Sequence, residues 1–291
     1  MIELTVALPM FRNKTIAHVA LESLCRQKDI DFDWELLIME EEQDCVGEEE
    51  LKKYVPRLEA IRCKRIKYWN IKDWIPLSEK WRKLGLASSP TSESFLIQAG
   101  DCYSQPYRLK ETYDLYASDP NIDWVQAPTG YFYDVSSETV ALFSKDFYKD
   151  IKWSKSARNH PCALNMSMRR KYASQLAEAN VKSSVDMWLF NQCKEMKGEA
   201  LVVGSIESDN WKLGVDVHGL NKISVKRGSR ILGSVPPFRQ SDANIDDIVP
   251  EDIAEFLRDI KQHVKRNQTI FNVPGNEPAR GKKKKSRKRR R

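Results

Sequence analysis

The 291-residue sequence has no apolar run of about 20 residues, the length that a membrane-spanning helix requires. Its first residues, MIELTVALPMFRN, lack a basic stretch followed by a long apolar segment, so no secretory signal is expected. The six cysteines lie far apart and form no Cys-x-x-Cys pair, which argues against a zinc site or a disulfide framework. Reduced thiols are typical of the cytosol, and these absences together predict a cytoplasmic protein without a transmembrane segment.

The basic residues are concentrated at the C-terminus. Residues 280–291 (RGKKKKSRKRRR) contain ten of the 48 Lys and Arg residues, which leaves 38 against 41 acidic residues elsewhere, a net charge of −3. Such a block cannot build a core, so we expect residues 273–291 to be disordered. It would bind polyanions through counterion release. Three roles stay open: a nucleic-acid tether, a nuclear or nucleolar address, and binding to acidic membranes or simple solubility.

The body of the chain alternates between strand and helix patterns. Apolar alternation predicts a first strand over residues 4–8 that stops at Pro9, followed by a helix over residues 16–24 that Asn13 caps. Further strands are expected at 36–39, 95–97, 124–127 and 201–203, and helices at 54–61, 77–86, 169–179 and 186–194. Pro250 begins an amphipathic helix whose apolar face is Ile253, Phe256, Leu257, Ile260 and Val264. This order predicts an α/β fold with a doubly wound, mostly parallel sheet.

The segment 94–109, SFLIQAGDCYSQPYRL, passes from an apolar strand through an acidic turn to a helix. Its turn contains a lone carboxylate, Asp101. Open α/β sheets bind ligands at the carboxyl ends of their strands, and magnesium-type cations take one or two carboxylates together with substrate phosphates. Turns between a strand and a helix often contain Asp, so this motif depends on what surrounds it.

Six short motifs in order resemble the family-2-like glycosyltransferases with the GT-A fold. TVALPMFRNKTIAHVALESLCRQ resembles their first strand, Pro-x-x-Arg/Asn loop and first helix, and WELLIMEEEQD their second strand and acidic turn. EKWRKLGLAS resembles the helix with Arg-Asn-x-Gly, and FLIQAGDCYSQPYRL falls at the Asp-x-Asp metal motif. SSVDMWLFNQC and VHGLNKIS resemble a Glu-Asp helix start and a late His-Gly-x-Asn-x-Ser segment. The resemblance covers residues 5–224.

The resemblance implies a single GT-A domain at residues 1–240, a helical segment at 241–272 packed on it, and the tail at 273–291. It implies transfer of a sugar from a nucleoside diphosphate sugar to an acceptor hydroxyl with Mn²⁺ or Mg²⁺. The residues expected to bind the donor are Pro9, Arg12, Glu40, Arg82 and Lys83. Glu40 replaces the usual Asp that contacts the base, and Arg82 and Lys83 either face the diphosphate or form a solvated helix face.

Asp101 and His218 are the metal ligands that the resemblance implies. The Asp-x-Asp motif reads Ala99, Gly100, Asp101 here, so only its last carboxylate is present. His218 could instead be an ordinary surface residue of a Gly-rich loop. Asp186 is the expected general base of an inverting reaction, although Ser183-x-x-Asp186 also fits a helix capping box.

The acceptor is less constrained than the donor. The basic tail and the reduced thiols favour nucleic acid, for example a hydroxymethylated pyrimidine of viral DNA that is flipped from the duplex, which would place the protein in host cytoplasm or nucleus. A glycan, a lipid-linked sugar or a protein is the alternative acceptor. A catalytically dead scaffold that binds nucleic acid is an alternative of another class. The sequence has no Gln-x-x-Arg-Trp motif, which disfavours a processive polymer synthase.

Overall fold

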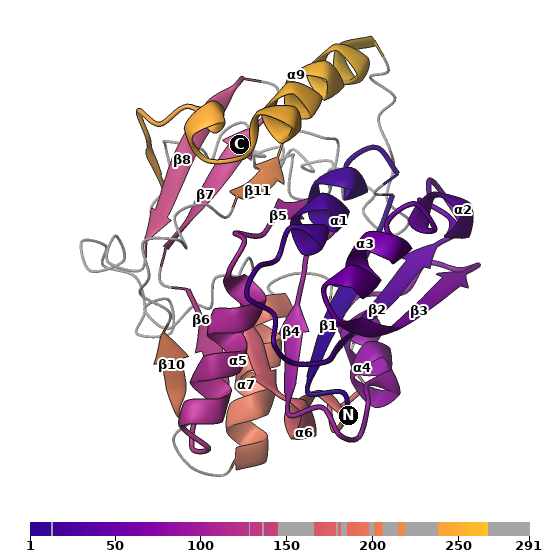
Figure 1. Cartoon of the computed structure of the whole chain (residues 1–291), viewed down its shortest axis with the longest axis vertical. Coiled ribbons are helices and arrows are strands. Elements are labelled where there is room, and N and C mark those ends of the chain that lie inside the picture. The colour runs from indigo at the N-terminus through magenta and orange to yellow at the C-terminus, as the bar shows by residue number, and fades with distance from the viewer. Residues whose placement is uncertain are drawn as a thin grey trace, which may run out of the picture.

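A seven-stranded sheet with strand order β10-β6-β9-β4-β1-β2-β3 forms the centre of the molecule (Figure 1). The computed structural model describes residues 1–12, 14–127, 129–135, 137–144, 166–178, 180–181, 185–197, 201–205, 215–218 and 238–266. The strands are β1 (Leu4–Pro9), β2 (Trp34–Glu41), β3 (Cys63–Ile71), β4 (Ser94–Ile97), β6 (Trp124–Gln126), β9 (Ser167–Arg169) and β10 (Val203–Ser205). Only β9 runs antiparallel to its neighbours in this sheet, which confirms the mostly parallel sheet expected from the sequence.

Helices cover both faces of this sheet, because successive residues of its buried strands point to opposite sides. Val6 and Leu8 of β1 pack on one face with helices α1 (Ala17–Cys25), α2 (Glu48–Leu51), α3 (Val55–Ala60) and α5 (Arg108–Ser118). Ala7 packs on the other face with α4 (Leu77–Ala87), α6 (Arg170–Ala173) and α7 (Val185–Lys197). The expected doubly wound α/β architecture is therefore confirmed.

A second sheet of five strands, in the order β12-β8-β7-β11-β5, adjoins the first. Its strands are β5 (Cys102–Tyr103), β7 (Thr129–Asp134), β8 (Thr139–Ser144), β11 (Val215–His218) and β12 (Phe238–Gln240). β5 begins directly after Asp101 and pairs antiparallel with β11. The first strand of the second sheet along the chain therefore follows the candidate metal ligand directly. The sequence patterns did not predict this sheet.

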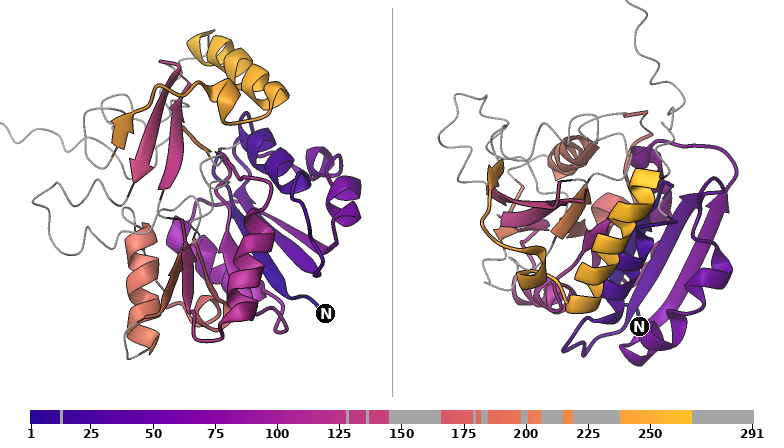
Figure 2. Two further views of the ribbon diagram at one scale, coloured as in Figure 1. Left: turned by 60° about the vertical axis from the view of Figure 1, so that its left-hand side comes forward. Right: turned by 90° about the horizontal axis from the view of Figure 1, so that it is seen from above.

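The C-terminal helix α9 (Glu251–Arg266) follows a short 3₁₀ turn, η5 (Ile245–Asp247), and lies beside α1 and the second sheet (Figure 2). Ile253 and Leu257 are buried against Val19 of α1, which confirms the packing face expected after Pro250. Arg26 at the end of α1 also forms an ion pair with Asp252. Among the described residues, no helix has the length and apolar character needed to cross a membrane. The tail at 273–291 lies outside the described residues.

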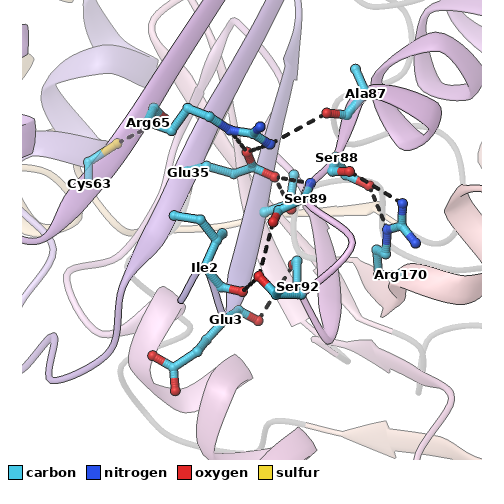
Figure 3. A network of polar contacts seen from close by, with 12 residues as sticks. Ile2, Glu3, Glu35, Cys63, Arg65, Ala87, Ser88, Ser89, Ser92 and Arg170 are labelled. Carbon is cyan, nitrogen blue, oxygen red and sulfur yellow. Dashed lines mark hydrogen bonds and ion pairs between the residues drawn. The ribbon is translucent and has the colours of Figure 1, made fainter.

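A buried carboxylate ties the sheet together near its amino end (Figure 3). Glu35 of β2 is fully buried and accepts hydrogen bonds from Thr5 Oγ1 at 2.6 Å and from the backbone N–H of Ser89 at 2.7 Å. It also forms an ion pair with Arg65 of β3. Because a buried charge is tolerated only when it is paired and hydrogen-bonded, this cluster fixes β1, β2, β3 and the segment after α4 relative to one another.

Three expectations from the sequence need correction. Residues 63–71 form β3, so residues 95–97 are not the third strand along the chain. The Lys and Arg residues of β3 hide the kind of apolar alternation that makes β1 recognisable in the sequence. The helix expected at 169–179 is only the single turn of α6. Asn13 lies outside the described residues, and the residue that precedes the first turn of α1 is Ile16, with no side-chain cap.

Gly85 allows α4 to approach α6 closely. A methyl group at this position would overlap the backbone carbonyl of Ala173, which cannot move away as a flexible side chain can. We expect Gly85→Ala to reduce the free energy of unfolding by about 1–3 kcal/mol, although Ala normally stabilises a helix relative to Gly. Urea denaturation measures this change. Leu86→Ala on the exposed side of the same helix is the control and should change stability by less than about 0.5 kcal/mol; an equally stable Gly85→Ala protein would contradict the close contact.

Candidate functional site

Three neighbouring parallel strands, β4, β1 and β2, end at the same edge of the large sheet. The loops that leave this edge begin after Pro9, Glu41 and Ile97. Open α/β sheets bind their ligands at such an edge. The parallel arrangement therefore brings together the sequence segments of Pro9, Glu40 and Asp101, which are far apart along the chain.

A buried lysine joins two of these strand ends. Lys80 of α4 is 2 % exposed, and its Nζ donates to the backbone oxygen of Met10 at 2.5 Å and to Glu41 Oε2 at 2.6 Å. The other oxygen, Glu41 Oε1, is also buried, and no described residue donates a hydrogen bond to it. A buried acceptor without a donor is costly, so Glu41 presents an oxygen suited to a ligand N–H or O–H at this edge.

Glu40 organises the loop that follows β2. Its two carboxylate oxygens accept the backbone N–H groups of Val46 and Gly47, both at 3.0 Å, and Oε1 accepts the Tyr68 hydroxyl at 2.7 Å. Burial and this hydrogen bond to Glu40 raise the pKa of Tyr68. Gly47 adopts a positive φ of 82° where the chain enters α2. Glu40 therefore holds the loop at residues 42–47 in a fixed conformation.

Arg12 lies in the loop after β1, with a positive φ of 52° that non-glycine residues rarely adopt. Its Nη2 donates to Gln43 Oε1 at 2.5 Å, and its guanidinium lies 5.1 Å from the centre of the Phe11 ring. The backbone N–H of Lys14 donates to the carbonyl of Asp44 at 3.1 Å. The loops after β1 and β2 therefore contact each other, and Arg12 lies at their junction.

Asp101 lies in a turn that a buried polar network fixes. Gln98 Nε2 donates to the backbone oxygens of Ala99 and Cys102 at 3.1 and 2.8 Å. Gln98 Oε1 accepts from Ser104 Oγ at 2.5 Å and from Arg108 Nη1 at 2.7 Å. Gln98 and Arg108 are fully buried, whereas Asp101 is partly exposed. The network thus closes the turn from inside and leaves the Asp101 carboxylate in a position that solvent can reach.

The backbone of His218 lies on the strand that pairs beside this turn. Val215 and Asp216 of β11 pair with Tyr103 and Cys102 of β5 in antiparallel register. Continued by one residue, this register brings Val217 to the level of Asp101, with His218 next. Its side chain lies outside the described atoms. Within the described residues, no group of three or more His, Cys, Asp or Glu side chains has metal-binding spacing.

Asp186 lies in the first turn of α7. The direction of this helix shows at which end of the sheet Asp186 lies. Near the other end of α7, Lys197 pairs at 2.5 Å with Asp123, which precedes β6 and so lies at the amino end of the sheet. Before α7, the backbone N–H of Val181 donates at 3.4 Å to Ser78 Oγ in the first turn of α4. Since α7 is about 20 Å long, its first turn lies toward the carboxyl edge, the same edge as Asp101.

Arg82 and Lys83 interact with neighbours on and near α4. Arg82 forms two hydrogen bonds with Glu79, at 2.6 and 2.7 Å, and these hold the pKa of Glu79 below its usual value. Lys83 lies 3.7 Å from the same carboxylate, and Glu178 lies 3.9 Å from Arg82. The structure does not bring either cation into a described contact with Asp101, Glu40 or Arg12, and their diphosphate role stays a prediction.

Two residues of this edge, Lys80 and Glu41, were missed in the sequence. Lys80 precedes Arg82 in the segment EKWRKLGLAS, where a run of cations gives no sign of which one is buried. Its position three residues after Leu77 and four before Leu84 places it on the same side of the helix as these two residues, but Leu77 is exposed and Leu84 is buried, so the spacing does not show whether Lys80 is buried. The run of three glutamates at 40–42 likewise does not show which carboxylate faces the edge.

Solved structures of other proteins have the same fold. Over 74 % of the chain it matches TarS 1–349 of S. aureus, solved also with UDP, at 12 % identity and a TM-score of 0.53. Over 77 % it matches the mannosyltransferase PcManGT from Pyrobaculum calidifontis, solved with GDP-Man and Mn²⁺, at 10 % identity and a TM-score of 0.52. The chain spans about 60 % of the length of these proteins. No family model and no curated protein matches the sequence. The structural likeness shows that the chain has the GT-A glycosyltransferase fold.

Replacement of Lys80 tests whether the Lys80–Glu41 pair supports the edge. We expect Lys80→Met to lower the free energy of unfolding by about 3–5 kcal/mol, because it leaves Glu41 buried without its cation. Glu41→Leu combined with Lys80→Met should recover most of this loss. Urea denaturation of the wild type, both single variants and the double variant measures the coupling between the two residues. If the losses in free energy of unfolding of the two single variants simply add in the double variant, the pairing is contradicted.

Proposed function

We propose that the protein is a glycosyltransferase that moves a sugar from a nucleoside diphosphate sugar to an acceptor hydroxyl. The observation that carries this proposal is the convergence of three segments at the carboxyl edge of a GT-A sheet. These are the loop of Arg12, the Glu41 carboxylate with its unsatisfied oxygen, and the partly exposed carboxylate of Asp101. The two solved structures described above carry UDP or GDP-Man, which supports the choice of donor class.

The nucleoside would bind beside Pro9, Arg12 and Glu40. Both oxygens of Glu40 already accept hydrogen bonds from the 42–47 loop and Tyr68, so Glu40 would act by shaping that loop. Glu41 Oε1 is the acceptor suited to a base N–H, and Lys80 holds the other oxygen of this carboxylate. Arg82 and Lys83 would serve the diphosphate only after leaving Glu79.

The residues present fit a hard divalent cation. Asp101 supplies one partly exposed carboxylate, and β11, the strand of His218, pairs with β5 directly after Asp101. Mg²⁺ and Mn²⁺ are commonly held by one or two carboxylates together with waters and phosphate oxygens, so a single Asp is sufficient on the protein side. Bound there, the cation would stabilise the negative charge of the leaving nucleoside diphosphate.

Asp186 would act as the general base of an inverting transfer. Its carboxylate accepts the proton of the acceptor hydroxyl while that oxygen bonds to the anomeric carbon, and the bond from this carbon to the diphosphate oxygen breaks. A positioned base of this kind contributes about 10²–10⁴-fold to the rate. Its place in the first turn of α7, toward the carboxyl edge, supports the assignment.

Nucleic acid is the acceptor that we propose, with hydroxymethylated DNA as its specific form. The support is the segregation of charge, because residues 280–291 hold ten basic residues while the remainder carries a net charge of −3. The tail would supply sequence-independent affinity for phosphates while the domain supplies the chemistry. This acceptor would place the protein in host cytoplasm or nucleus as an enzyme of viral DNA modification. A glycan, lipid-linked or protein acceptor is the alternative.

Release of nucleoside diphosphate from a panel of nucleotide sugars tests the donor chemistry. We expect Mn²⁺-dependent release from one donor, its loss in EDTA, and a decrease of at least about 100-fold in Asp101→Ala, because the leaving group loses its charge stabilisation. Asp114→Ala, an exposed aspartate of α5, is the matched control and should retain activity. Failure to release from any donor, with or without DNA and glycan acceptors, would favour the dead scaffold that binds nucleic acid.

Deletion of residues 280–291 tests the acceptor. Transfer to hydroxymethylated DNA should fall steeply at 150 mM salt, because counterion release from phosphates no longer contributes, whereas donor hydrolysis should be unchanged. The measurement is sugar incorporation into DNA beside diphosphate release without acceptor. Unchanged transfer to DNA would contradict the tether.

A further inference from the structure

The C-terminal helix α9 runs antiparallel to α1 and so points toward the loop that follows β1. Asp252, in the first turn of α9, pairs with Arg26, which directly follows the last residue of α1. Four residues further along α9, the centre of the Phe256 ring lies 4.7 Å from that of His18, which is in the first turn of α1. Successive contacts along α9 therefore move from the end of α1 back to its beginning.

The end of α9 extends past α1 on the side of the carboxyl edge. Ile260 belongs to the same buried cluster as Ile16, the residue just before α1, and Arg266 lies about 9 Å further along the helix axis. The residues that precede α1 are those of the loop after β1, which leaves the sheet at its carboxyl edge. In Figure 1, α9 lies at the top and the N-terminus at the bottom, and the left view of Figure 2 agrees.

The charge along α9 changes sign between its two ends. Residues 251–259 contain four acidic residues and one Arg, whereas residues 261–266 (KQHVKR) contain three basic residues and no acidic residue. Cations in the last turn of a helix suit its macrodipole, so this pattern alone implies no partner. The chain, however, continues from this turn through residues 267–279 into the ten basic residues of 280–291. A connection of 13 residues spans at most about 45 Å, so the basic block begins within that distance of the end of α9.

The carboxyl edge itself carries acidic side chains that repel a chain of phosphates. Glu42, Asp44 and Glu48, in and directly after the loop that follows β2, are all exposed. A nucleic acid strand therefore reaches this edge only when cations are brought there to neutralise its phosphates. Among the described elements, α9 is the one that leads from the edge into the basic tail.

We propose that α9 presents the basic tail at the carboxyl edge, so that a nucleic acid strand held by residues 280–291 enters the candidate site from the side of α9. The position of the tail then matters as well as its charge. The acidic loop after β2 faces phosphates that the tail has neutralised. Delivery of an acceptor to the donor rests on the glycosyltransferase proposed above, whereas the side from which the strand approaches does not depend on turnover.

Two variants of identical composition test the position of the tail, with the wild type measured beside them. Both lack residues 267–279, so that the basic block 280–291 is attached without a spacer. In the first variant the block follows Arg266 directly, on the side of the carboxyl edge. In the second it precedes residue 1, at the amino end of the sheet. The six residues of β1 alone separate these two ends by about 20 Å.

A photo-cross-linking amino acid reports where the strand lies. It replaces Glu42 at the carboxyl edge or, in separate proteins, Glu93, which directly precedes β4 at the amino end; both side chains are exposed. The ligand is a labelled single strand of about ten nucleotides, one for each cation of the block. Anisotropy at several salt concentrations measures its affinity for each variant, and cross-linking is compared at equal fractions bound.

We expect both variants to bind the strand with equal affinity and equal salt dependence, because they carry the same cations. The first variant should cross-link at residue 42 about tenfold more than at residue 93, and the second should show the reverse, since a short tether raises the local concentration only near its attachment point. Equal cross-linking at residue 42 in both variants would overturn the proposal. Cross-links from residue 42 to the tail that the strand does not displace would also overturn it, because the tail would then dock on the acidic loop. Binding to phosphatidylserine vesicles without binding to the strand would overturn it in favour of a membrane surface.

Sugar transfer separates this inference from the proposed function. With hydroxymethylated DNA as the acceptor, transfer per molecule of donor hydrolysed should be about tenfold higher in the first variant than in the second. If no donor is turned over while the cross-linking pattern holds, the glycosyltransferase fails and the entry side stands. If both variants transfer sugar equally well, the glycosyltransferase stands and the entry side is overturned. Circular dichroism of both variants verifies that the fold is retained.

Discussion

The buried ammonium of Lys80 is the contact on which the candidate site depends. It holds the end of β1 through Met10 and the end of β2 through Glu41, and α4 carries it to both. Burial of an ion pair costs desolvation energy that an apolar pair would avoid, so such a pair is weak evidence for stability alone. Here it fixes the loops at the edge of the sheet and leaves one buried carboxylate oxygen, Glu41 Oε1, without a hydrogen-bond donor among the described residues. This buried, unsatisfied oxygen is what makes the edge a candidate ligand site.

The carboxyl edge combines rigid support with polar groups suited to a ligand. Gln98 and Arg108 fix the Asp101 turn from within the core, and Glu40 fixes the neighbouring loop through its backbone amides. The groups that would meet a ligand, Glu41 Oε1 and Asp101, are thus held by partners that do not themselves contact it. A site on rigid supports binds with less loss of conformational freedom.

The sequence predicts the parts of this fold whose patterns are local. Apolar alternation predicts β1, and the Pro250 helix shows its buried face directly. β3 is missed because it is an edge strand whose exposed positions carry lysine. The second sheet is missed because β5, β11 and β12 are short strands that pair with distant segments, and only β7 and β8 form a local hairpin. In the candidate site, Asp101 is predicted from its strand–turn–helix context, and its metal-binding role stays a prediction. Lys80 was missed because burial of one lysine among several cations follows from tertiary packing alone.

Hydrogen exchange of the full-length protein, with and without Mn²⁺ and the nucleoside diphosphate that binds it most tightly, tests the site most directly. If the carboxyl edge binds the donor, exchange should slow in the segments 10–12, 42–47 and 98–103 and remain unchanged at the amino end around Ser89. Slowed exchange confined to other segments, with nucleotide binding confirmed by calorimetry, would place the ligand elsewhere and contradict the donor site.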